Sequence, residues 1–232
     1  MGFDWLFSPV EWIDGHLEEW ATGAPIWVAL LLAALLGLRH ATDPDHVMAI
    51  VTLQGTEGSR VRGAARLGAW WGVGHAATLL VVGVPLIALD DALPGPVQAW
   101  SERLVGVLIV ALALRAAIRW WRGRPLRAAG ATAPAPLADR TPAAAFGIGV
   151  LHGLAGTGAV VLLVLATLPS TATAYLALAV FAPMSVVSMA ACSAAWGWLA
   201  TRISRSRLVG DLFAVAASTF ALLFGVWYVA AV

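Results

Sequence analysis

Six long apolar segments restrict what this chain can fold into. Each is long enough to cross the hydrocarbon core of a bilayer, about 30 Å thick, which takes about 20 helical residues. Backbone polar groups in lipid must be paired within their own segment, so each segment is predicted to be a helix. The segments lie near residues 25–52, 66–89, 101–121, 143–168, 172–199 and 209–231. The sequence therefore predicts an all-α membrane protein with six transmembrane helices.

The composition supports this class and excludes others. Hydrophobic residues make up 60% of the chain and charged residues only 12%, whereas soluble domains carry about a quarter charged residues. The net charge of +1 and the lack of a basic, aromatic-rich block argue against a nucleic-acid partner. Cys192 is the only cysteine, so neither an intrachain disulfide nor a cysteine-based metal site is expected. No cleavable signal peptide is expected either, because the first residues lack a basic stretch followed by an apolar core.

The arginines predict how the helices cross the membrane. Most of them fall between spans one and two, three and four, and five and six, while the other side receives most of the acidic residues and one main basic exception, Arg103. Cytoplasmic loops carry the excess of basic residues, so these three loops are predicted to be cytoplasmic and both termini outside. Tryptophans, among them Trp27, Trp70, Trp71 and Trp100, are expected at the two membrane interfaces.

Two segments outside the six spans have distinct compositions. Residues 1–24 repeat apolar side chains at helical spacing opposite an acidic face, which predicts an amphipathic helix on the outer surface or capping the bundle. The stripe comprises Phe3, Leu6, Phe7, Val10, Ile13, Leu17 and Trp20. Residues 123–142, rich in Pro, Ala and Arg, predict a cytoplasmic linker.

This linker divides the spans into two three-helix repeats, residues 25–122 and 143–232. With three spans in each half, the second half enters the membrane in the opposite sense, as in the inverted repeats of transporters. The strings "GLRHATDPDH" (37–46) and "GVLHGLAGTG" (149–158) both place Gly three residues before His. An inverted 3+3 repeat is therefore predicted, with chance similarity between two Gly- and Ala-rich helices as the alternative.

Four titratable residues and a proline interrupt span one. They are His40, Asp43, Pro44, Asp45 and His46. Pro44 cannot donate to the carbonyl one turn back and fits best at the first position of a helix. This makes Asp43 the N-cap and places Asp45 and His46 in the first turn. The first span is therefore predicted to stop and restart, which lets Asp45 and His46 turn inward with His40. The alternative is a packed proline kink with both carboxylates capping.

Two further spans carry a buried histidine at a similar predicted depth. His75 and His152 lie about 10–15 Å from the cytoplasmic ends of their spans, and His40 lies about 20 Å from the outer end of its own. Ionisable residues at this depth are costly, so they are functional candidates by default. His16, on the polar N-terminal helix, is expected to be solvated.

The predicted metal ligands are His40, Asp43, Asp45, His46, His75 and His152. Imidazole with carboxylate suits Ni²⁺, Co²⁺, Zn²⁺ or Cu²⁺ better than Mg²⁺ or Ca²⁺. Glycines beside these histidines allow helices to approach closely. In span five, Met184 and Met189 are expected to fill the core, with a pathway-lining role for Ser185 and Ser188 as the weaker prediction.

These motifs resemble a known family. His40, Asp45 and His46 in "RHATDPDHVMAI" resemble the signature of the nickel/cobalt transporter (NiCoT) family, and "GHAAT" around His75 looks like its second histidine helix. "HGLAGTGA" at His152 is similar to the shorter, urease-accessory-type nickel permeases. The resemblance implies metal binding by His40, Asp45, His46 and His75. Longer members have eight spans and a "GFDTATE"-type motif, which this chain lacks.

The sequence thus predicts a permease for Ni²⁺ or Co²⁺ in the plasma membrane of a prokaryote, with the lipid bilayer and the ion as its partners. The metal is cargo; no cofactor is expected, and the oligomeric state, a homo-oligomer included, is left open. The chain is not expected to be an enzyme, since neither a phosphate-cradling loop nor His-Glu-x-x-His is present. The alternatives are a six-span exporter of a small solute or anion, similar to lysine exporters, with His and Asp as a proton relay, and a haem carrier or intramembrane enzyme.

Overall fold

The structure is a computed structural model that describes residues 3–21, 25–54, 61–89, 94–128, 141–154, 168, 170–203 and 205–231. All regular structure within these ranges is helical, which confirms the predicted all-α class. The helices are α1 (Asp4–Ala21), α2 (Ile26–His40), α3 (Pro44–Gln54), α4 (Val61–Leu89), α5 (Gly95–Ala128), α6 (Pro142–His152), α8 (Thr171–Ile203) and α9 (Arg207–Ala231).

Within the described ranges, four single helices are long and apolar enough to cross a membrane. They are Val61–Leu89, Gly95–Arg122, Thr171–Ile203 and Leu208–Ala231, and the bent pair α2 and α3 adds a fifth span. Half of the predicted fourth span, 143–168, lies outside the described residues beyond α6. The protein is therefore a multi-pass membrane protein, and the sixth span stays a prediction.

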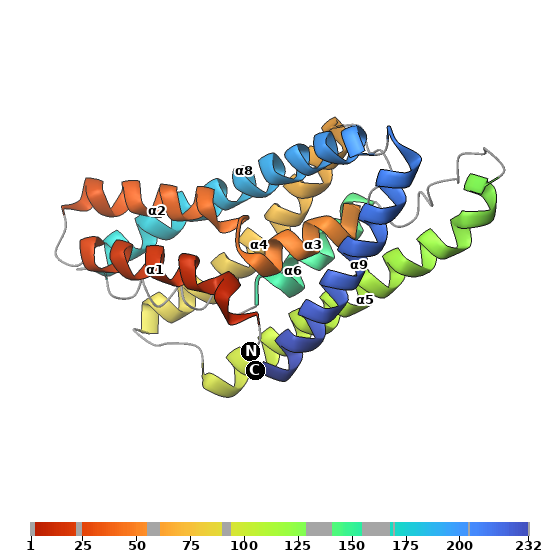
Figure 1. Cartoon of the computed structure of the whole chain (residues 1–232). Helices are drawn as coiled ribbons and strands as arrows, with labels where there is room; N and C mark the ends of the chain where they lie inside the picture. The colour runs from red at the N-terminus through yellow and green to blue at the C-terminus, as the bar shows by residue number, and fades with distance from the viewer. Residues whose placement is uncertain are drawn as a thin grey trace.

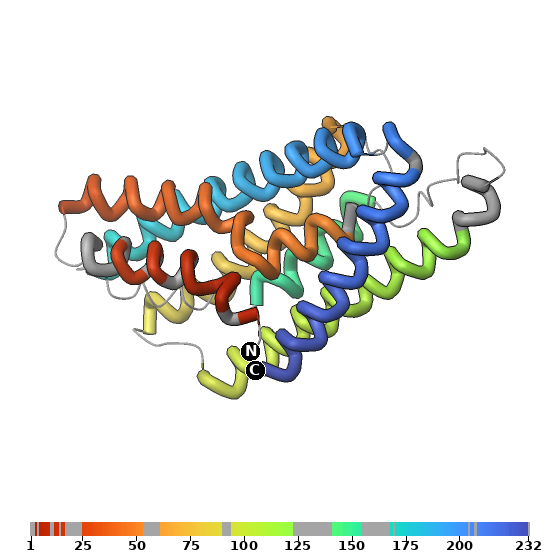
Figure 2. The backbone as a smooth tube through the Cα atoms, in the orientation of Figure 1, coloured from red at the N-terminus to blue at the C-terminus, as the bar shows by residue number. Residues whose placement is uncertain are grey.

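The first span is broken at the predicted place. α2 ends at His40, α3 begins at Pro44, and the two helices are bent by 41°. The Asp43 carbonyl accepts the first hydrogen bond of α3 from the Val47 N–H at 2.9 Å, so Asp43 occupies the predicted cap position. Figure 2 shows the chain changing direction at this point.

The helices pack as two groups. α4 packs on α8 and α6, α2 packs on α8, and α5 packs on α9 (Figure 1). Buried side chains of α2, α4 and α8, among them Leu36, Leu79 and Phe181, form one core cluster. A second cluster, centred on Val105, Ile109 and Phe224, holds α5 against α9. α5 continues to Ala128, into the segment predicted as a linker.

The start of α1 packs on α9. Phe3 lies 5.3 Å from Phe220 and Phe7 stacks 6.1 Å from Phe224, measured between ring centroids. Trp5 and Trp12 are exposed on the same helix. The first part of the predicted apolar stripe therefore anchors α1, whereas the side chains of Val10, Leu17 and Trp20 lie outside the described residues.

Two glycines allow matching close contacts in the two halves. A Cβ at Gly37 of α2 would overlap the Phe181 carbonyl and crowd the Ser185 N–H of α8. A Cβ at Gly149 of α6 would overlap the Trp71 carbonyl and the His75 N–H of α4. Each glycine lies three residues before a histidine, and each meets two backbone groups four residues apart on the facing helix. Small residues let helix backbones approach in this way.

We expect Gly149→Ala to destabilise the protein, because the new methyl group would meet the backbone of α4. Overpacking of this kind costs about 1–3 kcal/mol. Gly147→Ala on the same helix is the matched control, since nothing lies within 4 Å of its added Cβ. Thermal unfolding of the purified protein in detergent compares the two, and equal stabilities would contradict the close approach of α6 to α4.

Candidate metal centre

A serine of α8 stabilises the break in the first span. Thr42 donates its N–H to the Arg39 carbonyl at 2.8 Å, so it does not continue the regular pattern to Leu38. The Leu38 carbonyl instead accepts a hydrogen bond from the Ser188 hydroxyl, which also accepts from the Ala41 N–H at 3.4 Å. Inside a membrane an irregular backbone is tolerated only where protein satisfies it. Ser188 therefore supports the break, a more specific role than the predicted pathway lining.

The break brings four histidines together. His40 at the end of α2, His46 in α3, His75 in α4 and His152 at the end of α6 have no solvent-exposed surface. The ring of His46 lies 4.4 Å from that of His40, 5.3 Å from that of His75 and 4.3 Å from that of His152, between centroids. The histidines that the sequence predicted at similar depths in their spans therefore lie together in one cluster.

Three of these imidazoles form a group that could hold an ion. His40, His46 and His75 each offer one ring nitrogen, and these atoms lie within 4.8 Å of one another. The Nε2 atoms of His40 and His75 are 2.8 Å apart, so they either share a proton or face a common cation. Two ligands about 2.0 Å from one ion and at right angles stand about 2.8 Å apart. The spacing fits both states.

His40 and His46 of the first span each have an aspartate carboxylate beside Nδ1. Asp43 Oδ2 is 3.3 Å from His40 Nδ1, and Asp45 Oδ1 is 3.1 Å from His46 Nδ1. Both contacts use Nδ1, which leaves Nε2 of each ring for another partner. A carboxylate on the far nitrogen is the usual way to fix the orientation of a metal-binding histidine and to raise its basicity.

The two aspartates differ in their other partners. Asp43 Oδ1 accepts a hydrogen bond from Arg39 Nη1 at 2.7 Å, so the formal charges of these two residues cancel. Asp45 Oδ2 lies 3.1 Å from His152 Nε2. Asp45, His46 and His152 form a second group of potential ligands, whereas Asp43 is in neither group. Among the described residues, Asp45 is therefore the carboxylate that contacts the histidines without an arginine as partner.

Two aromatic side chains that the sequence analysis did not place here pack against the cluster. Trp71 is fully buried and its ring lies 5.6 Å from His46 and 5.5 Å from His152, between centroids. Trp71 was predicted near a membrane interface, and the structure shows that its ring faces neighbouring helices and not lipid. Phe181 packs 5.3 Å from His40. The four-residue spacings of Trp71 to His75 and Arg39 to Asp43 could have indicated these neighbours, because such pairs share a helix face.

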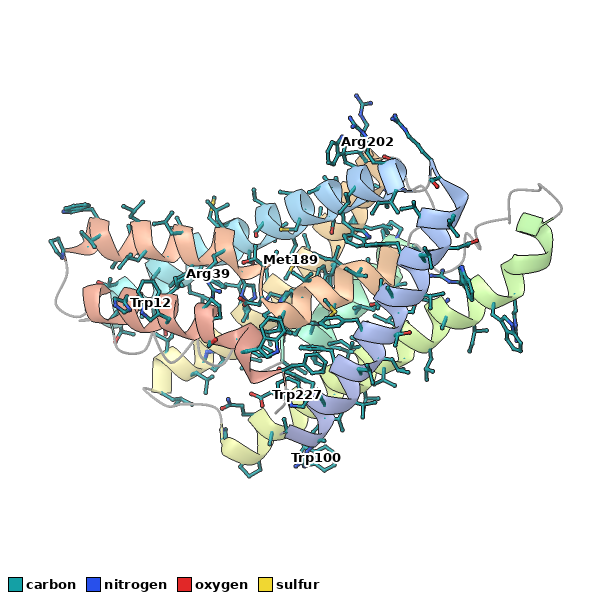
Figure 3. The ribbon with its side chains drawn as sticks, in the orientation of Figure 1. Trp12, Arg39, Trp100, Met189, Arg202 and Trp227 are labelled. Atoms are coloured by element: carbon teal, nitrogen blue, oxygen red, sulfur yellow. The ribbon has the colours of Figure 1, made fainter. Side chains whose placement is uncertain are left out.

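The remaining predicted residues lie elsewhere. Met189 is fully buried in a cluster with Ala41 and Trp71, which confirms core filling. Ser185 donates to the Ala182 carbonyl of its own helix at 2.8 Å. His16 is on an exposed face of α1, where its Nδ1 lies 2.9 Å from the Trp12 carbonyl. Figure 3 labels Arg39 and Met189 in the interior, and Trp100 and Arg202 at opposite edges.

The chain is similar to two named proteins. Urease accessory protein UreH of Bacillus sp. (strain TB-90) is 27% identical over 213 residues, which cover 86% of this chain and 89% of UreH. Chloroplast protein FOR GROWTH AND FERTILITY 1 of Arabidopsis thaliana is 29% identical over 189 residues, which cover 75% of this chain and 49% of that protein. The chain thus spans about half the length of the plant relative. No family model and no solved structure matches the chain.

The similarity to UreH extends over most of both chains and confirms the predicted resemblance to urease-accessory-type proteins. UreH is named an accessory protein, which agrees with the expectation that this chain is not an enzyme. The long apolar helices agree with a membrane location for the same region.

We expect Ser188→Ala to destabilise the protein by about 1–3 kcal/mol, because it leaves the Leu38 carbonyl without its buried donor. Ser185→Ala is the matched control, one turn earlier on α8, because the hydrogen bond that the Ser185 hydroxyl makes among the described residues is to the Ala182 carbonyl of its own helix. Its expected cost is below about 0.5 kcal/mol. Unfolding of both variants in mixed micelles measures the difference, and equal losses would contradict a special role of Ser188.

Proposed function

We propose that this protein is a membrane permease for a divalent transition-metal ion, Ni²⁺ or Co²⁺, and that His40, His46 and His75 bind the ion. The observation that carries the proposal is the burial of three imidazoles from α2, α3 and α4 with their ligand atoms within 4.8 Å of one another. Burying so many polar rings costs free energy unless each is paired. Ionisable side chains at membrane depth are therefore functional candidates. Transport accounts for placing them among membrane-crossing helices.

The donor set favours a transition metal. Imidazole nitrogen is a good ligand for Ni²⁺ and Co²⁺ and a poor one for Mg²⁺ and Ca²⁺, which prefer oxygen. The resemblance to NiCoT proteins and to UreH supports nickel or cobalt in particular. In this proposal the carboxylates of Asp43 and Asp45 orient His40 and His46 through Nδ1, while the Nε2 atoms face the ion. The negative charge of Asp45 offsets part of the desolvation of the cation.

We infer an inverted 3+3 repeat from the pairing of helices. α2 packs on α8 as α6 packs on α4, and the pairs α4–α8 and α5–α9 join corresponding helices of the two halves. The matched contacts of Gly37 and Gly149 support the same relation. Rocking of one repeat against the other is the usual route to alternating access.

The proposed location is the plasma membrane of a prokaryote, with both termini outside. The C-terminal ends of α3, α5 and α8 and the N-terminal ends of α4, α6 and α9 lie toward the right in Figure 1. These are the ends that border the arginine-rich loops, which the positive-inside rule places in the cytoplasm. Inward movement of a divalent ion then gains roughly 4.6 kcal/mol per 100 mV of membrane potential.

We expect His40→Ala and His46→Ala each to abolish Ni²⁺ accumulation by cells that express the protein, because each removes one of three nitrogen donors. His16→Ala is the matched control, since His16 lies on the exposed face of α1. Cellular nickel is measured by mass spectrometry and protein levels by immunoblot. Wild-type accumulation by both variants would contradict the proposed site.

The second candidate function is an exporter that uses the cluster as a proton relay. It is favoured by the hydrogen-bonding distances from His40 to His75 and from Asp45 to His46 and His152. A calorimetric titration of the purified protein with Ni²⁺ distinguishes the two functions. Saturable binding supports the permease, whereas proton-coupled transport without metal binding supports the relay.

A further inference from the structure

The second ligand group joins the two halves of the protein. Asp45 and His46 belong to α3 in the first half, whereas His152 ends α6 in the second half. The carboxylate of Asp45 lies 3.1 Å from one nitrogen of each histidine, through Oδ1 to His46 Nδ1 and through Oδ2 to His152 Nε2. All three side chains are fully buried. This group is a carboxylate with two imidazoles, a donor set that binds transition metals.

Several buried nitrogens of the cluster lack a hydrogen-bond partner among the described residues. They are His40 Nδ1, His46 Nε2, His75 Nδ1 and His152 Nδ1. The 3.3 Å contact of His40 Nδ1 with Asp43 Oδ2 is an ion-pair distance and does not have hydrogen-bond geometry. Buried polar atoms in proteins are normally paired, so such atoms call for an explanation. His46 contacts Asp45 through Nδ1 and leaves Nε2 open, and its ring lies at nearly equal distances, 4.4 and 4.3 Å, from those of His40 and His152. It stands between the two groups.

We propose that the ion occupies two alternative positions, one at His40–His46–His75 and one at Asp45–His46–His152, with His46 common to both. This inference rests on the proposed function and adds a route to it. Two divalent cations that share one imidazole would repel each other strongly in a buried site, so one ion is held at a time.

Exchange between the two positions moves the ion from one half of the protein to the interface between the halves. The first position uses only α2, α3 and α4, and the second replaces two of its imidazoles by Asp45 and by His152 of α6. A shift of α6 relative to α3 therefore changes the second position and leaves the first intact. A conducting site must bind the ion and also release it, and several weak positions achieve this better than one strong position.

The test compares His75→Gln, His152→Gln and the double variant of the full-length protein, with His16→Gln as control. Binding of Ni²⁺ is measured by calorimetry in detergent, and uptake is measured in proteoliposomes. We expect wild-type protein to bind one ion. Each single variant keeps binding within about tenfold of wild type, because one position survives, but loses at least about tenfold in uptake. The double variant loses binding by at least about a hundredfold.

A protein with the first position alone gives another result. His75→Gln then loses as much binding as the double variant, and His152→Gln binds and transports like wild type; either outcome overturns the inference, as does binding of two ions at once. Asp45→Asn tests the second position, because it removes the charge of Asp45 while keeping an acceptor for His46. Normal uptake by this variant also overturns the inference. Wild-type protein that neither binds nor transports Ni²⁺ or Co²⁺ contradicts the proposed function itself, whatever the variants do.

Discussion

A helix in a bilayer must pair its own backbone groups, and Pro44 prevents this within the first span because it has no N–H. The chain leaves the helix after His40 and re-enters it at Pro44. α8 lies against this break and stabilises it through the Ser188 hydroxyl, which donates to the Leu38 carbonyl. Gly37 in turn allows α2 to approach α8 closely. The position of α8, the break and the inward direction of His46 therefore depend on one another.

Charge balance explains how so many polar groups remain buried together. The positive charge of Arg39 offsets the negative charge of Asp43, four residues later. The carboxylate of Asp45 contacts two imidazoles, those of His46 and His152. The Nε2 atoms of His40 and His75 lie 2.8 Å apart, and the rings of Phe181 and Trp71 pack against His40 and His46. A cluster of imidazole rings beside the carboxylate of Asp45 is suited to receive a divalent cation, because nitrogen and oxygen donors lie together there.

The sequence predicted the features that depend on local pattern. Apolar length predicted helices, and Asp43-Pro44 predicted the break, because proline restricts its own turn whatever surrounds it. The meeting of His75 and His152 with the first span followed from depth alone. The partners of each side chain could not be predicted, because they depend on how the helices face one another. Trp71 illustrates this: its position suggested an interface, and its contact with α3 and α6 became visible only in the packed structure.

The central claim is that the broken first span and its neighbours hold a transition-metal ion through histidine nitrogen. X-ray absorption at the nickel edge of the Ni²⁺-loaded, full-length protein tests this most directly. The account predicts scattering from at least three imidazole rings with nitrogen about 2.0–2.1 Å from the metal. A spectrum of nickel surrounded by water oxygen alone, without imidazole scattering, would contradict it.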